Sequence, residues 1–163
     1  MPFTTHKRPT PNVSRGKNRL LGVVFHHTAG GCAGAVSWLT NRASGASAHV
    51  VIDRDGTRYV LAEPEAITWH AGKSCWKGVN GANSVTLGVE FVLTVPQVEA
   101  DVALTSEQIA SALEYLAPIA KRQGWGLDDF THHAAICTPP GRKRDLSPKN
   151  WALVKAALDK VYD

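Results

Sequence analysis

The chain has few cysteines and no long apolar run, and both features limit what it can be. Its 163 residues include three cysteines, Cys32, Cys75 and Cys137, whose odd number and spacing argue against a disulfide framework. No apolar run approaches the length of a membrane-spanning helix, and the first residues lack the apolar stretch of a signal peptide. We therefore expect no membrane insertion and a protein made in the cytosol.

Two motifs of common zinc enzymes are also absent. No segment reads His-Glu-x-x-His, which excludes the helix of thermolysin-like proteases. No His-x-Glu precedes a Pro-Cys-x-x-Cys, which argues against a zinc deaminase of nucleobases.

The composition is that of an ordinary globular protein with a basic surface. Hydrophobic residues make up 44% of the chain and charged residues 20%, with a net charge of +4 and a pI of about 9.1. Such a charge most often marks a solvated face, but it also suits an anionic polymer such as a cell-wall glycopolymer or nucleic acid. Because the sequence has no aromatic or helical readout elements for nucleic acid, we expect no nucleic-acid partner.

Periodicity predicts alternating strands and helices. Strands are expected over residues 20–25, 48–53, 58–61, 86–93 and 127–131. Helices are expected over residues 33–42, after a capping box at Thr105 and Gln108, and after Ser147-Pro148, with Pro118 kinking or shortening the second. This order predicts one α/β domain over residues 20–163, in which a central mixed β-sheet has helices packed on both faces. Residues 1–19, which are polar and rich in Pro, Thr and basic side chains, are expected to form a flexible arm.

Histidines follow two of the predicted strands. His26 and His27 end the apolar run at residues 23–25, and His132 and His133 follow the strand that ends at Thr131. Asp145 lies a short distance further along the chain. Three nitrogen and oxygen ligands from separate stretches can hold a tetrahedral zinc ion with a fourth position open for a reactive water. The pattern predicts a zinc hydrolase.

Several segments in order resemble one known family. They are Phe25-His26-His27-Thr28-Ala29-Gly30, Ser47-Ala48-His49 through Thr57, Trp69-His70-Ala71-Gly72, Asn83-Ser84 with Leu87-Gly88-Val89-Glu90, and Gly141-Arg142-Lys143-Arg144-Asp145. They are similar to the type 2 N-acetylmuramoyl-L-alanine amidases, which include phage amidase endolysins, bacterial autolysins and peptidoglycan recognition proteins. The resemblance extends over about residues 20–160.

The resemblance implies an activity, a cofactor and a partner. The expected reaction is zinc-dependent hydrolysis of the amide between N-acetylmuramic acid and L-alanine of the peptidoglycan stem. We expect a monomeric phage endolysin that accumulates in the host cytoplasm and acts on the cell wall after membrane breach. The alternatives are a cytosolic peptidoglycan-recycling amidase and a non-catalytic peptidoglycan-binding module.

The resemblance also implies the metal ligands. They are His26, one imidazole of the second pair, and Asp145, and the strand-end register favours His132 over His133. Residues 134–140 form a longer connection than is usual in the family and contain Cys137. Because another branch of the family uses a cysteine ligand, Cys137 is a competing candidate for the third position.

Further residues are expected around the metal. Glu90 is the only carboxylate on an apolar strand, where burial would be costly without a purpose, and it matches the family's general base. The resemblance assigns Lys143 to the stabilisation of negative charge on the attacked carbonyl oxygen. Trp69, His70 and His49 are expected to contact the substrate, and Trp69 could stack on a sugar ring.

Overall fold

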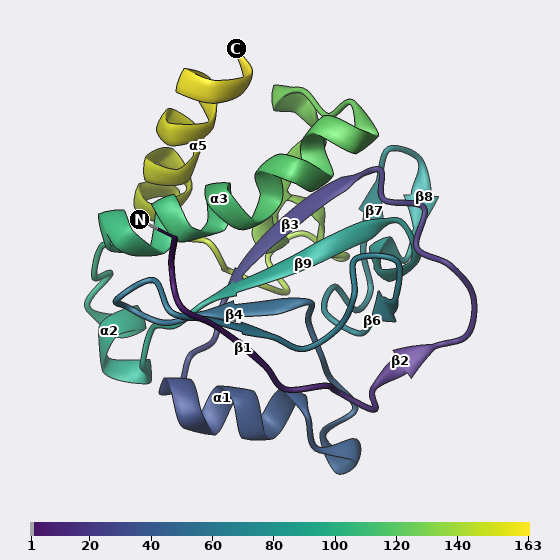
Figure 1. Ribbon diagram of the computed structural model, residues 1–163, viewed down its shortest axis with the longest axis horizontal. Coiled ribbons are helices and arrows are strands. Elements are labelled where there is room, and N and C mark those ends of the chain that lie inside the picture. The colour runs from purple at the N-terminus through teal and green to yellow at the C-terminus, as the bar shows by residue number, and fades with distance from the viewer. Residues whose placement is uncertain (1) are drawn as a thin grey trace.

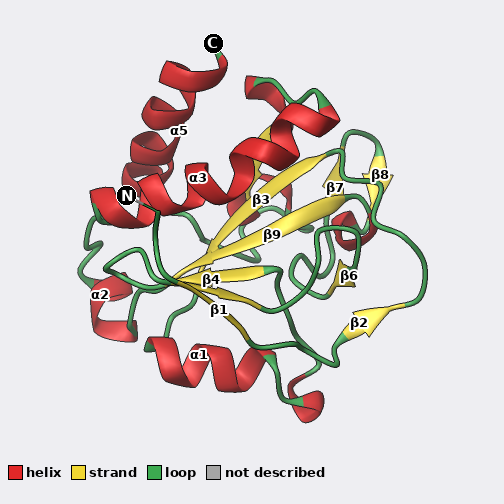
Figure 2. Ribbon diagram, in the orientation of Figure 1, coloured by secondary structure: helices red, strands yellow, loops and turns green. Residues whose placement is uncertain are grey.

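A six-stranded sheet forms the centre of the computed structural model, which describes residues 2–163 (Figures 1 and 2). The strand order is β1-β5-β4-β9-β3-β10. The bounds are β1 Thr5–Lys7, β3 Gly22–His27, β4 Val50–Ile52, β5 Arg58–Val60, β9 Thr86–Phe91 and β10 Phe130–His132. All neighbouring pairs are parallel except β4 with β5, so the sheet is mixed as predicted.

Helices cover both faces of this sheet (Figure 1). Helices α3 (Ser106–Gln123) and α5 (Pro148–Tyr162) lie on one face, and α1 (Cys32–Leu39) lies on the other. Side chains alternate along β4 accordingly: Val50 and Ile52 belong to the core under α3 and α5, whereas Val51 packs with Leu39 of α1. The predicted α/β fold class is confirmed.

Shorter elements complete the chain. Helices α2 (Val95–Glu99) and α4 (His133–Ile136) and the 3₁₀ turns η1 (Arg42–Ser44), η2 (Ala82–Ser84) and η3 (Leu127–Asp129) connect the main elements. The stretch between β5 and β9 contains β6 (Ile67–Thr68), β7 (Cys75–Trp76) and β8 (Val79–Asn80). Strand β6 pairs with β2 (Val13–Ser14), and β7 pairs with β8. The stretch between β5 and β9 is therefore held at β6, β7 and β8 by strand pairing.

Helix α3 begins as predicted but does not stop at its proline. The Thr105 side chain accepts a hydrogen bond from the backbone N–H of Gln108, whose side chain bonds back to the Thr105 N–H. Pro118 lies inside the helix on its exposed side, and the helix continues to Gln123. Of the two expected effects, kinking or shortening, Pro118 does not shorten the helix; water can reach the backbone on that side.

The prediction of a flexible arm over residues 1–19 was also wrong for its described part, residues 2–19; Met1 lies outside the described residues. Strand β1 pairs with β5 as the edge of the main sheet. The side chain of Asn12 is fully buried and donates to the carbonyls of Asn41 and Ala46, and that of Asn18 donates to the carbonyl of Thr86. These polar side chains satisfy backbone groups of distant loops, which composition alone does not reveal.

The parallel register gathers the predicted site at one edge of the sheet. Strands β3, β9 and β10 run in the same direction, so their carboxyl ends lie together. In this register His26 is paired with Glu90, and Phe25 with His132. Open α/β sheets commonly bind ligands beyond the carboxyl ends of such strands.

Candidate active site and zinc site

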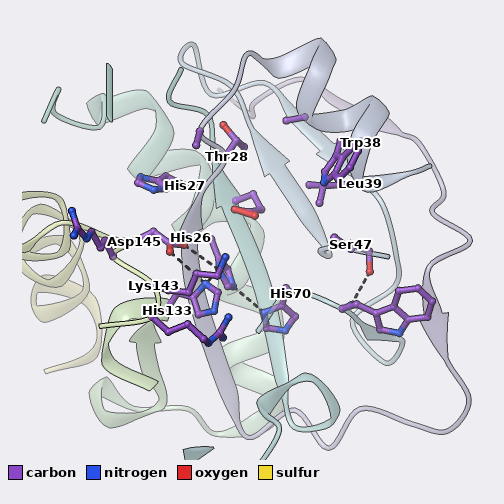
Figure 3. A pocket seen from close by; sticks show the side chains of 17 residues that line it. His26, His27, Thr28, Trp38, Leu39, Ser47, His70, His133, Lys143 and Asp145 are labelled. Atoms are coloured by element: carbon purple, nitrogen blue, oxygen red, sulfur yellow. Dashed lines mark hydrogen bonds and ion pairs between the residues drawn. The ribbon is translucent and has the colours of Figure 1, made fainter. Parts of the chain in front are cut away.

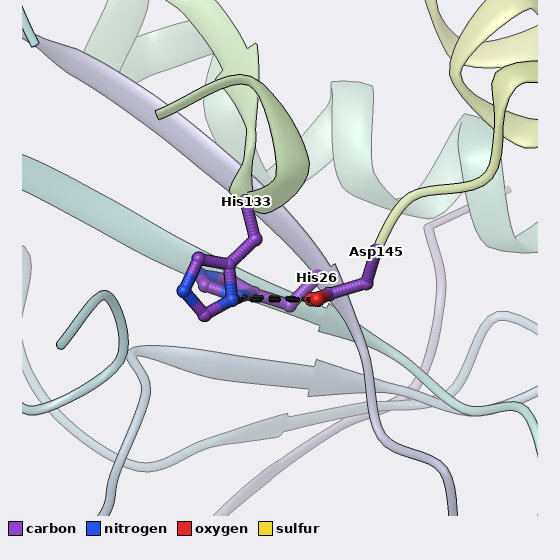
Figure 4. A group of neighbouring side chains, drawn as sticks. All are labelled: His26, His133 and Asp145. Atoms are coloured by element: carbon purple, nitrogen blue, oxygen red, sulfur yellow. Dashed lines mark hydrogen bonds and ion pairs between the residues drawn. The ribbon is translucent and has the colours of Figure 1, made fainter. Parts of the chain in front are cut away.

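Two imidazoles and a carboxylate converge at the carboxyl ends of strands β3, β9 and β10 (Figure 4). The Nδ1 atoms of His26 and His133 are 3.0 Å apart. Asp145 approaches them with its two oxygens, at 3.3 Å from His26 Nδ1 and 3.4 Å from His133 Nδ1. All three residues are buried, and one candidate ligand atom from each lies within 4.8 Å of the others. Asp145 is ionised: burial would raise its pKa, but contacts with His133 and His26 lower it below its usual range.

The hydrogen bonds behind His26 fix which of its nitrogens is free. The hydroxyl of Thr86 donates to the carbonyl of Ala82 at 2.6 Å, so it accepts from His70 Nε2 at 3.3 Å. His70 Nδ1 then carries a lone pair and accepts from His26 Nε2 at 2.9 Å. This leaves a lone pair on His26 Nδ1, which faces the cluster. Burial lowers the pKa of His26, and contact with Asp145 offsets only part of this, so the imidazole is neutral.

His133 is oriented in the same way by a backbone carbonyl. Its Nε2 lies 3.0 Å from the oxygen of Ala71, which can only accept, so Nε2 carries the hydrogen and Nδ1 is left for the cluster. Two imidazole lone pairs beside an ionised carboxylate require protons or a cation between them. A donor set of two imidazoles and one carboxylate is that of a catalytic zinc site with one open position. The residues therefore fit zinc.

The structure corrects the choice within the second histidine pair: His133, not His132, lies beside His26 and Asp145. His132 stacks instead on Trp151 of α5, with ring centroids 4.5 Å apart. Because His132 is in register with Phe25, it points to the α3 and α5 face, as Phe25 does. His26 and His133 each lie one residue later and point to the opposite face. The apolar Phe130 followed by the polar Thr131 was the sequence signal for which of the two histidines points away from the α3 and α5 face.

Cys137 is not part of the cluster. Its buried Sγ accepts from the backbone N–H of Lys143 at 3.4 Å, so it supports the loop that carries Lys143 and Asp145. The two candidates for the third ligand position are thus separated in space, and Asp145 is the one that reaches both imidazoles.

Glu90 and Lys143 line the same cleft as the three residues of the cluster. Figure 3 shows Lys143 in this cleft together with His26, His133 and Asp145. Glu90 lies beside His26 in the sheet, and its Oε2 is inaccessible to solvent and has no hydrogen-bond partner among the described residues. Burial, together with the nearby charge of Asp145, raises the pKa of Glu90 well above its usual value, and Lys143 opposes this shift. An unpartnered carboxylate with a raised pKa is suited to accept and release a proton.

The cleft has a volume of about 460 Å³ and aromatic side chains on its rim. Trp69 lines the cleft, and its indole Nε1 donates to Ser14 Oγ at 2.8 Å. Trp38 of α1 also lines the cleft and is 58% exposed, an unusual position for so large an apolar side chain. The sequence analysis missed Trp38 because its helical pattern gave no sign of the cleft.

His70 lies in the cleft wall, and His49 does not reach the cleft. His49 is fully buried, its Nε2 donates to the carbonyl of Ala66 at 2.8 Å, and its Nδ1 accepts from the N–H of Gly88 at 3.0 Å. The expectation that His49 contacts substrate is therefore corrected to a structural role. Burial lowers the pKa of His49 to about 4.

Gly88 is a second residue that the sequence analysis missed. A Cβ at this position would lie 2.5 Å from Cγ of His70, so the ring that orients His26 occupies space that only glycine leaves free. A glycine inside an otherwise apolar, β-branched strand was the available signal.

A family-wide sequence model described as N-acetylmuramoyl-L-alanine amidase matches residues 16–149. The chain belongs to this family. The family predicted from the sequence is confirmed. Relatives include the N-acetylmuramoyl-L-alanine amidase XlyB of Bacillus subtilis, 29% identical over 144 residues, which are 85% of this chain and 42% of XlyB. AmiD of Escherichia coli is 27% identical over 141 residues, which are 80% of this chain and 50% of AmiD. The chain thus spans half or less of these relatives.

Solved structures of this amidase family share the fold. A selenomethionine AmpD derivative superposes with a TM-score of 0.77 at 22% identity, covering 94% of each chain. E. coli AmiD, solved in complex with the substrate anhydro-N-acetylmuramic acid-L-Ala-D-gamma-Glu-L-Lys, gives a TM-score of 0.74 at 23% identity, over 88% of this chain and 59% of AmiD.

Within residues 2–163, no helix has both the length and the apolar composition needed to cross a bilayer.

Proposed function

We propose that this chain is a zinc-dependent peptidoglycan hydrolase that cleaves the amide between N-acetylmuramic acid and L-alanine of the stem peptide. The observation that carries the proposal is the convergence of His26 Nδ1, His133 Nδ1 and the Asp145 carboxylate beside the unpartnered carboxylate of Glu90. The amidase names of the matched relatives support the substrate class.

His26, His133 and Asp145 would hold the metal ion. When bound at such a site, zinc lowers the pKa of a water molecule and polarises the amide carbonyl. Three protein ligands would leave zinc a fourth position for a water molecule. Glu90 and Lys143 line the same cleft as the three ligands.

Glu90 and Lys143 supply the remaining chemistry. The Glu90 carboxylate accepts a proton from the attacking water as the new carbon–oxygen bond forms. It then delivers that proton to the nitrogen of L-alanine as the carbon–nitrogen bond breaks, which gives an amine and the lactyl carboxylic acid. The acid proton then passes to the amine, so the products are the lactyl carboxylate on the sugar and the ammonium group of L-alanine. The ammonium of Lys143 lowers the energy of the negative charge that develops on the carbonyl oxygen.

For the biological setting we propose the polymeric cell wall as substrate, as in a phage endolysin. The support is the open cleft with Trp38 exposed on its rim and Trp69 in its wall, since exposed indoles suit the apolar faces of sugar rings. A recycling amidase acts on soluble fragments, so the ratio of rates on intact sacculi and on a soluble muramyl peptide separates the two roles.

The experiment that tests the activity is mass spectrometry of the products from purified sacculi. We expect stem peptides with a free N-terminal L-alanine, a loss of release after chelation, and recovery on addition of zinc. Glu90→Gln is the matched control, because it preserves side-chain size but cannot accept the proton. Reducing sugar ends in the products, or binding without any release, would contradict the proposal and favour a glycosidase or a binding module respectively.

A further inference from the structure

The guanidinium of Arg142 is bound to backbone carbonyls. Its Nε donates to the oxygen of Thr138 at 3.1 Å, and its Nη2 donates to the oxygens of Ala71 at 3.3 Å and Lys73 at 2.9 Å. Among the described residues, no carboxylate lies within ion-pair distance of Arg142. Gly72, at φ +56°, passes so close to this side chain that a Cβ would lie 3.1 Å from Nη2. The arginine thus joins the loop that carries Asp145 to residues 71–73.

The segment held by Arg142 orients both histidines of the zinc site. The carbonyl of Ala71, which accepts from Arg142, also accepts from His133 Nε2 at 3.0 Å. The preceding residue, His70, accepts from His26 Nε2 at 2.9 Å. Any displacement of residues 70–71 would therefore turn both imidazoles away from the shared position in front of Asp145.

The same segment is held from its other side by Asn83. The Asn83 Oδ1 atom accepts from the backbone N–H groups of His70 at 3.1 Å and Ala71 at 2.7 Å. Asn83 thus holds the N–H groups and Arg142 holds the carbonyls. No regular strand or helix constrains residues 70–73. These side-chain bonds, together with the backbone bond from the Thr138 N–H to the carbonyl of Lys73 at 2.9 Å, take the place of such an element.

We propose that Arg142 is a positioning residue of the zinc site, an inference that rests on the proposed metal site. It acts through the Ala71 carbonyl on His133 and through the His70–Ala71 backbone on His26. Loss of groups that orient metal-bound histidines typically weakens metal affinity by about 10- to 100-fold.

The charge of Arg142 and its hydrogen bonds have opposite effects on zinc affinity. Whether removal of Arg142 raises or lowers that affinity therefore decides which effect dominates. A guanidinium at the rim of the site repels a divalent cation, so its removal should strengthen zinc binding if electrostatics alone matters. If Arg142 positions the ligands, its removal should weaken zinc binding instead.

The experiment is a zinc competition titration against a chromogenic chelator with Arg142→Gln, Arg142→Lys and Arg144→Gln. Arg144 also lines the cleft, but among the described contacts no hydrogen bond joins its side chain to residues 70–73. Arg144→Gln therefore removes the same charge and leaves the hydrogen bonds of Arg142 in place. We expect zinc affinity to fall by about tenfold or more in both Arg142 variants. It should be unchanged or higher in Arg144→Gln. Arg142→Lys keeps the charge, but its single ammonium cannot reproduce the guanidinium fork.

A second measurement separates positioning from a general loss of folding. In the zinc-bound wild type, the Nε2 proton of His133 should give a protected imidazole NMR signal, and in Arg142→Lys this proton should exchange faster while the backbone amide signals of the sheet persist. The inference is overturned if the wild type binds zinc and either folded Arg142 variant binds it as tightly, with an unchanged His133 signal. Should Arg142→Gln fail to fold, Arg142→Lys decides the question. A wild-type protein that binds no zinc would instead refute the proposed function.

Discussion

His26 and Glu90 lie side by side on the parallel strands β3 and β9, and both side chains face the cleft. Because paired residues of neighbouring strands share a face, the register places a carboxylate next to a candidate metal ligand without help from any loop. The unpartnered Oε2 of Glu90 and the free Nδ1 of His26 are therefore both carried by central strands of the sheet, β9 and β3. Catalytic groups on regular elements are positioned more accurately than groups on loops.

The adjacent residues His132 and His133 provide a matched pair for testing the metal site. His133→Ala should lose stoichiometric zinc, because it removes one of the converging nitrogens. His132→Ala should retain zinc and lose only stability, since it removes a ring that stacks on Trp151. Elemental analysis of protein never exposed to chelator measures both. Zinc loss in His132→Ala together with retention in His133→Ala would contradict the site.

Lys143 should affect the rate of hydrolysis but not the metal. Lys143→Ala is expected to keep zinc and the fold and to lower kcat by about 100-fold or more, the usual cost of losing a group that stabilises the negatively charged oxygen. Lys155→Ala is the control, because it removes the same charge from the exposed face of α5, where Lys155 forms an ion pair with Asp159 at 4.0 Å. Steady-state kinetics on a soluble muramyl peptide measures both variants. Equal kcat values for the two would remove Lys143 from the mechanism.

Two glycine substitutions should have opposite effects on stability. Gly88→Ala would place a Cβ 2.5 Å from the His70 ring, so we expect a loss of about 1–3 kcal/mol and weaker zinc binding. Gly34→Ala, inside α1 where no atom lies within 4 Å of the added methyl group, should stabilise the protein by up to about 1 kcal/mol. Thermal unfolding of the metal-free variants measures both changes. The packing account of Gly88 fails if its alanine variant is as stable as the wild type.

His49 should make the protein sensitive to acid. Its folded-state pKa is lowered from 6.5 to about 4, so only the unfolded chain binds this proton between those pH values. Stability from His49 is fully present above pH 6.5 and is lost as pH falls toward 4, by roughly 3 kcal/mol. The free energy of unfolding of metal-free protein should therefore fall more steeply over this window in the wild type than in His49→Gln. Parallel curves would show that folding does not lower the pKa of His49.

Local sequence signals predicted the elements of the fold well. The β-branched run before His26, the capping box at Thr105 and Gln108 and the Ser147-Pro148 helix start depend on nearest neighbours, and the structure contains each of them. The sheet edge at β1 could not be found in this way, because its partner β5 lies some fifty residues further along the chain. Its polar residues carry no hydrophobic alternation to indicate the pairing.

The candidate site was predictable in its composition but not in its orientation. Residue types drew attention to His26 and Glu90, and the family resemblance assigned roles to these two residues and to Asp145 and Lys143. All four lie at one cleft. The choice between His132 and His133 depends on which face of the sheet each side chain points to, and that requires the exact end of β10. The contribution of Arg142 depends on hydrogen bonds to residues far along the chain, which no local pattern encodes.

The first residues of the chain limit how this domain can be combined with others. Asn12 accepts at its carbonyl from Ser47 Oγ, which in turn accepts from the N–H of Trp69, and Ser14 accepts from the Trp69 indole. A truncated protein that starts at residue 20 would therefore lose both an edge strand and the support of a cleft wall. For chimeric enzymes, a wall-targeting module is better fused after the exposed Asp163 at the end of α5 than in place of the N-terminal residues.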